Sequence, residues 1–180
     1  MSKIGQKSIP VPTSVQVEIT DRNIMVKGTK GTMSLELPRT LKITQNDGEL
    51  LIERKAESKK HKSVHGLWRS LIANAVRGVD QSWSKRLEVI GTGFNVKQQG
   101  NGIVLKLGLS HLVNFAAPEG IQIATEGNNL IIVSGVNKQK VGEIAQQIKS
   151  IKKPDAYKGK GIRYEGEHIK LKPGKKAKTA

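Results

Sequence analysis

Residues 41–54, LKITQNDGELLIER, resemble residues 121–134, IQIATEGNNLIIVS, when the chain is compared with itself at a shift of 80 positions. The same shift also superimposes a proline and a glycine that precede these stretches. A single offset that holds through two apolar runs, a proline and a glycine indicates an internal duplication. The matched pairs are Gly28 with Gly108, Pro38 with Pro118, Leu41 with Ile121, Ile43 with Ile123, Leu50 with Leu130, Leu51 with Ile131, and Ile52 with Ile132.

Each half of the chain contains short runs of strand-like apolar residues followed by one longer run with the period of a helix. The strand-like runs are residues 15–19, 23–27, 34–37, 41–43 and 49–53, and then 87–90, 94–97, 103–107, 113–115, 121–123 and 130–133. The first helical stripe, which ends near Gly78, is Val64, Leu67, Trp68, Leu71, Ile72, Ala75 and Val76, and the second is Val141, Ile144, Ala145, Ile148 and Ile151. Pro154 ends the second helix, because proline cannot continue an α-helix.

This order of elements predicts an α+β fold built from two similar modules, each an antiparallel sheet with one covering helix. We place the first module at residues 1–81 and the second at residues 82–180. The first module is the less basic, with a net charge of +6 against +10 for the second.

The charge of the chain narrows its class of partner. Its 180 residues include 31 lysines and arginines against 15 acidic residues, a net charge of +16 that attracts polyanions, and nucleic acid above all. The sequence has neither an apolar run of about 20 residues for a membrane-spanning helix nor a basic amphipathic helix for a lipid surface. Without cysteine there is no disulfide, and the start MSKIGQKSIPVP lacks the apolar core of a secretory signal. We therefore expect a cytoplasmic protein.

Motifs for catalysis, cofactors and metals are missing. No phosphate-binding GxxxxGK[ST] loop occurs, and GTGFNV at residues 91–96 fails the GxGxxG pattern because Val96 occupies the last glycine position. His61 and His65 have a spacing that suits two metal ligands, but they lie among lysines and lack a third ligand, which favours a solvated helix start. We predict no enzyme, no cofactor and no metal site.

The C-terminal stretch PDAYKGKGIRYEGE, residues 154–167, combines glycines, lysines and both tyrosines of the chain. From Lys152 onward the chain carries ten basic and three acidic residues. Gly159 and Gly161 remove side-chain bulk around Lys160, which would let backbone N–H groups approach a phosphate. Tyr157 and Tyr164 offer flat surfaces for a ribose or base. The alternatives are a solvated tail, and a Tyr157 that anchors the segment to the core of the second module.

The sequence also resembles a known family. PDAYKGKGIRY, residues 154–164, resembles the C-terminal signature of the bacterial-type large-subunit ribosomal protein L6 family. SKIGQKSIPVP at residues 2–12 and VKGTKGTMS at residues 26–34 resemble the opening of the same family. The resemblance covers essentially the whole chain. It implies two related α+β domains and a structural constituent of the large ribosomal subunit that binds large-subunit rRNA near the factor-binding region.

In this reading the partners are large-subunit rRNA, neighbouring ribosomal proteins and translation factors nearby. The RNA contacts lie in the second domain and tail, and Ser110 and His111 in GLSHLV match a loop of that domain, with Leu112 where the family usually has proline. A nucleic-acid-modifying enzyme and a free-standing RNA-binding regulatory module are the alternatives. The predicted RNA-binding residues are Lys152, Lys153, Tyr157, Lys158, Gly159, Lys160, Gly161, Arg163, Lys170, Lys172, Ser110 and His111.

Overall fold

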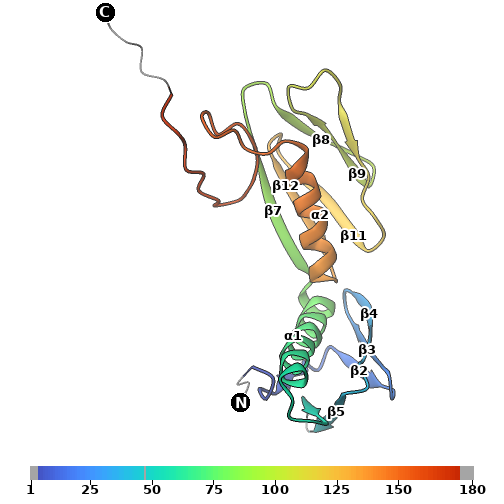
Figure 1. Cartoon of the computed structure of the whole chain (residues 1–180). Coiled ribbons are helices and arrows are strands. Elements are labelled where there is room, and N and C mark those ends of the chain that lie inside the picture. The colour runs from blue at the N-terminus through green and yellow to red at the C-terminus, as the bar shows by residue number, and fades with distance from the viewer. Residues whose placement is uncertain (1–3, 47, 175–180) are drawn as a thin grey trace, which may run out of the picture. The chain divides into compact units, whose positions relative to one another are not determined.

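The computed structural model describes residues 4–46 and 48–174, and the chain divides into two compact units (Figure 1). Unit 1 comprises Met1–Trp83 and Val136–Lys138, and unit 2 comprises Ser84–Gly135 and Gln139–Ala180. The predicted modules differ from these units in the placement of Ser82, Trp83 and Val136–Lys138. Among the described residues each unit pairs a helix with small sheets, which confirms the predicted α+β class.

Unit 1 contains two three-stranded sheets with the orders β1-β6-β5 and β2-β3-β4. We predicted a single sheet per module. Pro38 lies in the connection between the two sheets, and proline has no N–H with which to continue a ladder of hydrogen bonds. The elements are β1 (Ile9–Pro10), β2 (Gln16–Ile19), β3 (Asn23–Gly28), β4 (Gly31–Glu36), β5 (Leu41–Asn46), β6 (Glu49–Arg54) and α1 (Lys59–Gln81).

Helix α1 is capped at both ends by polar contacts of its own unit. The side chain of Ser58 accepts a hydrogen bond from the backbone N–H of His61 at 3.3 Å, as an N-cap residue does. Near the other end, the N–H of Lys30 in the β3–β4 turn donates to the carbonyl of Val79 at 2.9 Å. The turn thereby satisfies a carbonyl that has no partner within the helix.

The buried face of α1 is centred on Ile72, Val76 and Val79, which pack with Ile24 and Leu50 into the core of unit 1. Trp68 is partly buried and packs against this core, as predicted.

The prediction that Leu67 belongs to the apolar stripe is wrong, because 56% of this residue is exposed. Leu67 lies five residues before Ile72, which is about 140° around the helix. His65 lies seven residues before Ile72, nearly two full turns, and occupies the buried face instead, with 2% of its surface exposed.

Unit 2 combines the sheet β10-β9-β8 with the four-stranded sheet β11-β12-β7-β13. In Figure 1, α2 lies over the face formed by β7, β12 and β11. Pro118 again lies in the connection between the two sheets. The elements are β7 (Trp83–Ile90), β8 (Asn95–Gln99), β9 (Gly102–Lys106), β10 (Val113–Phe115), β11 (Ile121–Glu126), β12 (Leu130–Gly135), α2 (Lys138–Ile151) and β13 (Gly161–Tyr164).

The shift of 80 residues relates β5 to β11 without error, but it is wrong by one residue for β12. Gln45 pairs with Leu50, whereas Thr125, 80 positions later, pairs with Ile131, which is 81 positions after Leu50. The cause is a turn that is one residue longer, since β6 begins three positions after the end of β5 and β12 begins four positions after the end of β11. Leu50 and Ile131 are accordingly the equivalent buried residues.

Candidate nucleic-acid interface

A compact turn follows α2 and displays the predicted lysines. The Asp155 side chain accepts a hydrogen bond from the N–H of Lys158 at 2.9 Å, and its carbonyl accepts one from the N–H of Gly159 at 2.9 Å. The N–H of Asp155 in turn donates to the carbonyl of Lys160 at 3.0 Å. Aspartate commonly stabilises turns in this way, and Gly159 supplies the positive φ, +68°, that the turn requires. The backbone around Lys158 and Lys160 is therefore fixed.

Strand β13 attaches this turn to the core of unit 2. It pairs antiparallel with β7, with Gly161 opposite Ile90 and Tyr164 opposite Leu87, and Ile162 is completely buried. A Cβ added at Gly161 would lie 2.7 Å from the carbonyl oxygen of Lys153. Gly161 is thus a site of close backbone packing within the fold, a role that our sequence reasoning did not foresee.

Four lysines of the segment are exposed and have no acidic side chain as an ion-pair partner among the described residues. They are Lys153, Lys158, Lys170 and Lys172. The N–H of Lys172 donates to the carbonyl of Ala156 at 2.8 Å, which brings the tail beside the turn. The structure therefore places these lysines on the turn after α2 and on the irregular tail beside it. Lys175, Lys176 and Lys178 lie outside the described residues.

Three other predicted residues have contacts inside unit 2. Arg163 forms an ion pair with Glu88, with 3.0 Å between Nη2 and Oε2. Lys160 Nζ lies 3.1 Å from Thr92 Oγ1, and Lys152 is half-buried, with its carbonyl accepting from the N–H of Ile162 at 2.8 Å. Arg163 and Lys160 thus join the segment to β7 and to the loop that follows it, and Lys152 joins the end of α2 to β13.

The two tyrosines have different surroundings. Tyr157 is 59% exposed, so it does not anchor the segment in the core and its ring is open to a ligand. Tyr164 donates to Gln146 Oε1 at 3.1 Å, and Lys149 Nζ lies 4.6 Å from the centre of its ring. Tyr164 therefore belongs to the attachment of β13 to α2.

Glu167 completes this attachment. Lys149 Nζ lies 2.7 Å from both carboxylate oxygens of Glu167, and the N–H of Tyr164 donates to Oε2 at 3.0 Å. The hydrogen bond from Lys149 and then that from Tyr164 hold the pKa of Glu167 below its ordinary value of 4.5. Sequence reasoning missed Glu167, although an acidic residue inside so basic a tail was a usable signal.

Ser110 and His111 are exposed on the loop between β9 and β10. A Cβ added at Gly108, where this loop begins, would lie 3.0 Å from the ring of Phe94. Phe94 belongs to the β7–β8 loop, which also contains Thr92, the partner of Lys160. The β7–β8 loop thus packs against both predicted regions. Leu112 is 58% exposed and makes an apolar tip on the loop.

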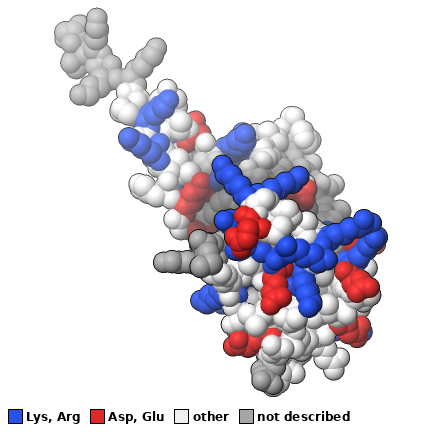
Figure 2. Space-filling view, turned by 60° about the horizontal axis from the view of Figure 1, so that its bottom comes forward, with Lys and Arg blue, Asp and Glu red and all other residues white. Residues whose placement is uncertain are grey.

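Basic side chains are not confined to the C-terminal segment. In Figure 2, lysine and arginine side chains lie beside the large grey group at the upper left. They also gather, interleaved with acidic side chains, on the face that this view turns forward. A test of the segment therefore needs a control in which the same number of charges is removed elsewhere.

His61 and His65 do not face a common ligand. His65 Nε2 lies 2.7 Å from the carbonyl oxygen of Ile52 in the core, whereas the His61 ring bonds to the hydroxyl of Ser58. Over the described ranges there is no group of three or more histidine, aspartate or glutamate residues that could hold a metal ion. No helix among those residues is long and apolar enough to cross a membrane.

Comparison with known proteins identifies the family. The family model for ribosomal protein L6 matches twice, at residues 11–82 and 90–165, which confirms the duplication. The chain is 44% identical over 179 residues to large ribosomal subunit protein uL6 of Caldanaerobacter subterraneus subsp. tengcongensis, covering 99% of each chain. It is 46% identical over 178 residues to uL6 of Synechococcus elongatus, with 99% of each chain covered. It is 47% identical over 176 residues to uL6 of Persephonella marina, with 97% of this chain and 98% of the relative covered. The chain therefore belongs to the ribosomal protein L6 family, whose members are structural rather than catalytic components of the ribosome.

Proposed function

We propose that this protein is a structural constituent of the large ribosomal subunit in the cytoplasm, and that it binds large-subunit rRNA through the C-terminal part of unit 2. Family membership supports the assignment to the subunit. The rRNA contact surface is the segment of residues 152–172 together with Ser110 and His111. Its position near the factor-binding region is what the family resemblance implies.

The observation that supports the contact surface is the sorting of charges in the segment. Glu88 pairs with Arg163 and Glu167 with Lys149, both beside β13, whereas the exposed side-chain amines of Lys153, Lys158 and Lys172 form no ion pair in the part of the chain that the structure describes. Unpaired lysines on a fixed turn suit phosphate binding, because their contact with phosphates releases counterions without first breaking an ion pair.

Tyr157 and Gly159 add recognition beyond charge. The exposed Tyr157 ring can stack on an unpaired base, which is a common mode of RNA binding. A Cβ at Gly159 would meet only Leu171 Cδ2, at 3.4 Å, so the turn itself leaves the backbone there open on its outer side. Gly159 is therefore the glycine that would admit a phosphate, while Gly161 serves the fold.

A pair of triple variants of the full chain tests this surface. The substitutions Lys153→Ala, Lys158→Ala and Lys172→Ala remove three charges from the segment. As the control, Lys55→Ala, Lys59→Ala and Lys60→Ala remove three charges from exposed residues of unit 1. Binding of each to transcripts that tile the large-subunit rRNA is measured from 50 to 200 mM salt.

The segment variant is expected to bind its transcript more weakly, with a slope of log K against log[salt] that is shallower by about 2 to 3, at 0.7 to 0.9 per lost phosphate contact. The control should keep most of the wild-type slope. Equal losses in the two variants would show that the chain binds RNA only as a diffuse cation, and the segment proposal would be wrong.

Sedimentation of cell extracts separates the assignment to the subunit from the alternative of a free-standing regulatory module. A subunit constituent sediments with large subunits in stoichiometric amount, whereas a free-standing module is found chiefly in the light fractions. Cross-linking of Tyr157 to rRNA within purified subunits then tests the position near the factor-binding region.

A further inference from the structure

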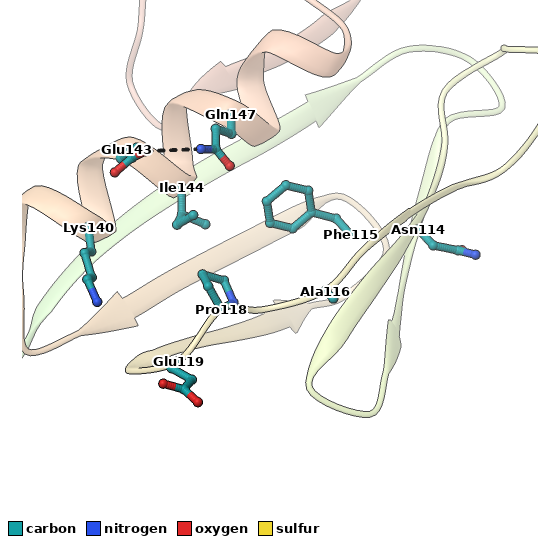
Figure 3. Close-up of a pocket in the computed structure, with 9 residues that line it drawn as sticks. All are labelled: Asn114, Phe115, Ala116, Pro118, Glu119, Lys140, Glu143, Ile144 and Gln147. Atoms are coloured by element: carbon teal, nitrogen blue, oxygen red, sulfur yellow. Dashed lines mark hydrogen bonds between the residues drawn. The ribbon is translucent and has the colours of Figure 1, made fainter.

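A groove lies on unit 2 between α2 and the connection from β10 to β11, with a volume of about 630 Å³. Figure 3 shows Phe115, Pro118 and Ile144 directed toward this space from its two sides, while Asn114 points away from it. The polar residues Glu119, Glu143 and Gln147 are exposed at the rim. The groove thus has an apolar floor and a polar rim, and none of its rim residues belongs to the proposed RNA surface.

The charge of the rim is opposite to that of the chain. Two carboxylates, from Glu119 and Glu143, stand against the single amine of Lys140, in a protein with 31 basic and 15 acidic residues. Glu119 makes no hydrogen bond or ion pair with any described residue, and Glu143 accepts a hydrogen bond from Gln147 Nε2 at 3.3 Å. At least one of these charges is therefore available to a partner.

This combination argues against two kinds of occupant. RNA would bring phosphates beside Glu119 and Glu143, and like charges in proximity disfavour association. A small-molecule site would have polar groups that converge on the ligand from within the cavity. Here the polar groups are exposed at the rim and the floor is apolar.

We propose that the groove docks a peptide segment of a neighbouring large-subunit protein. The segment inserts apolar side chains between Phe115, Pro118 and Ile144 and places lysine or arginine beside Glu119 and Glu143. A groove of this size provides little contact area, but inside an assembled subunit the segment is held nearby, and the resulting high effective concentration compensates for weak intrinsic affinity. The proposal rests on the assignment of the chain to the large subunit.

Photo-cross-linking within assembled large subunits tests the docking. The variant Ala116→p-benzoylphenylalanine places the photoreactive group on one wall of the groove, and Gln147→p-benzoylphenylalanine places it on the other. Ala124→p-benzoylphenylalanine, at an exposed position of β11 outside the groove lining, is the control. Subunits that contain each variant are purified by sedimentation, irradiated and analysed by mass spectrometry.

Both groove variants are expected to form adducts with the same peptide of one large-subunit protein, and this peptide should contain lysine or arginine next to apolar residues. The control should not form that adduct. Adding Glu119→Gln and Glu143→Gln to either groove variant should lower the adduct yield at least fivefold without changing the amount of protein in the subunit fraction.

Adducts with rRNA, with a peptide that lacks basic residues, or with no subunit component would each overturn the proposal, as would an unchanged yield after the two Glu→Gln substitutions. In all of these outcomes the protein is still found in large subunits, so the assignment to the subunit stands. Absence of the wild-type protein from the subunit fraction would refute both that assignment and the docking.

Discussion

Replacing Gly161 with alanine tests whether this glycine is required by the fold. The added Cβ would lie 2.7 Å from the carbonyl oxygen of Lys153 and from the Cα of Pro154. Both are backbone atoms of the turn that leaves α2, so the clash cannot be relieved by rotating a side chain. We expect β13 to move away from this turn or to separate from β7.

The magnitude follows from two contributions. Overpacking of a tight site costs about 1 to 3 kcal/mol. The φ of Gly161, +151°, is one that residues with a Cβ rarely adopt, and an unfavourable conformation of this kind costs about 1 to 3 kcal/mol more. Gly161→Ala should therefore destabilise unit 2 by roughly 2 to 6 kcal/mol.

Two other glycines of the same tail provide matched controls. Gly166 has a φ of +75° but no heavy atom within 4 Å of an added Cβ, so Gly166→Ala isolates the conformational cost of about 1 to 2 kcal/mol. At Gly174 an added Cβ also meets nothing within 4 Å and φ is not positive, so the effect of Gly174→Ala should stay within about 0.5 kcal/mol.

Urea denaturation with two probes locates the effect. Trp68 packs in unit 1, whereas Trp83 begins β7, a strand of unit 2, so the measurements use a Trp83→Phe background in which Trp68 fluorescence reports unit 1 and far-ultraviolet circular dichroism reports both units. In Gly161→Ala the dichroism transition should begin roughly 1 to 3 M lower in urea while the fluorescence midpoint is unchanged. Equal stabilities for the Gly161→Ala and Gly174→Ala proteins would show that the close packing does not constrain this position.

Three further measurements address the core, the attachment of β13 and the RNA surface. Trp68→Ala should lower the free energy of unfolding of unit 1 by roughly 2 to 4 kcal/mol, somewhat less than for a fully buried tryptophan. Because this change removes the fluorophore of unit 1, circular dichroism follows both this variant and its control, Leu67→Ala, which should leave the midpoint unchanged. The pKa of Glu167 is lower in the native state than its ordinary value of 4.5, so the ionised Glu167 stabilises unit 2 above pH 4.5, and this stabilisation is lost as the pH falls through the native pKa. In Glu167→Gln the acid-dependent loss of stability, followed by circular dichroism, should be smaller. Gly159→Val should weaken RNA binding although no charge is removed, whereas Lys175→Ala should cause only a small electrostatic loss, and equal losses would argue against a specific role for the turn.

Most elements of the fold could be predicted from the sequence because they leave a periodic apolar signal, whereas the short strands β1 and β13 do not. The stripes that contain Ile72 and Ile148 define α1 and α2, and the repeat relates β5 to β11. The division of each module into two sheets depends on hydrogen-bond ladders between distant strands, which periodicity does not encode. The position of β12 was predicted one residue out of register because a longer turn changes which side chains face the core without changing the apolar composition.

The candidate site was less accessible to sequence reasoning. The glycines and lysines of the segment were found as a composition pattern, but the pattern could not separate Gly159, which lies on an open turn, from Gly161, which is buried against a neighbouring backbone. Strand β13 was missed for a different reason. With only Ile162 completely buried, this short strand carries too few apolar residues to show a period of two.

The structural and RNA-binding roles of the segment do not compete, because the fold assigns them to different residues. Truncation after Ile151, which would remove the whole segment, would also delete β13 and the buried Ile162, and loss of RNA binding could then reflect unfolding. Truncation after His168 retains β13 and the Glu167 contacts but removes every lysine from Lys170 onward. We expect this shorter chain to keep the stability of unit 2 and to show a shallower salt dependence of RNA binding, by 0.7 to 0.9 for each lysine that contacts a phosphate. A truncated protein with full stability and an unchanged slope would show that the tail does not contact RNA, and would leave the turn around Lys158 as the only part of the segment that binds it.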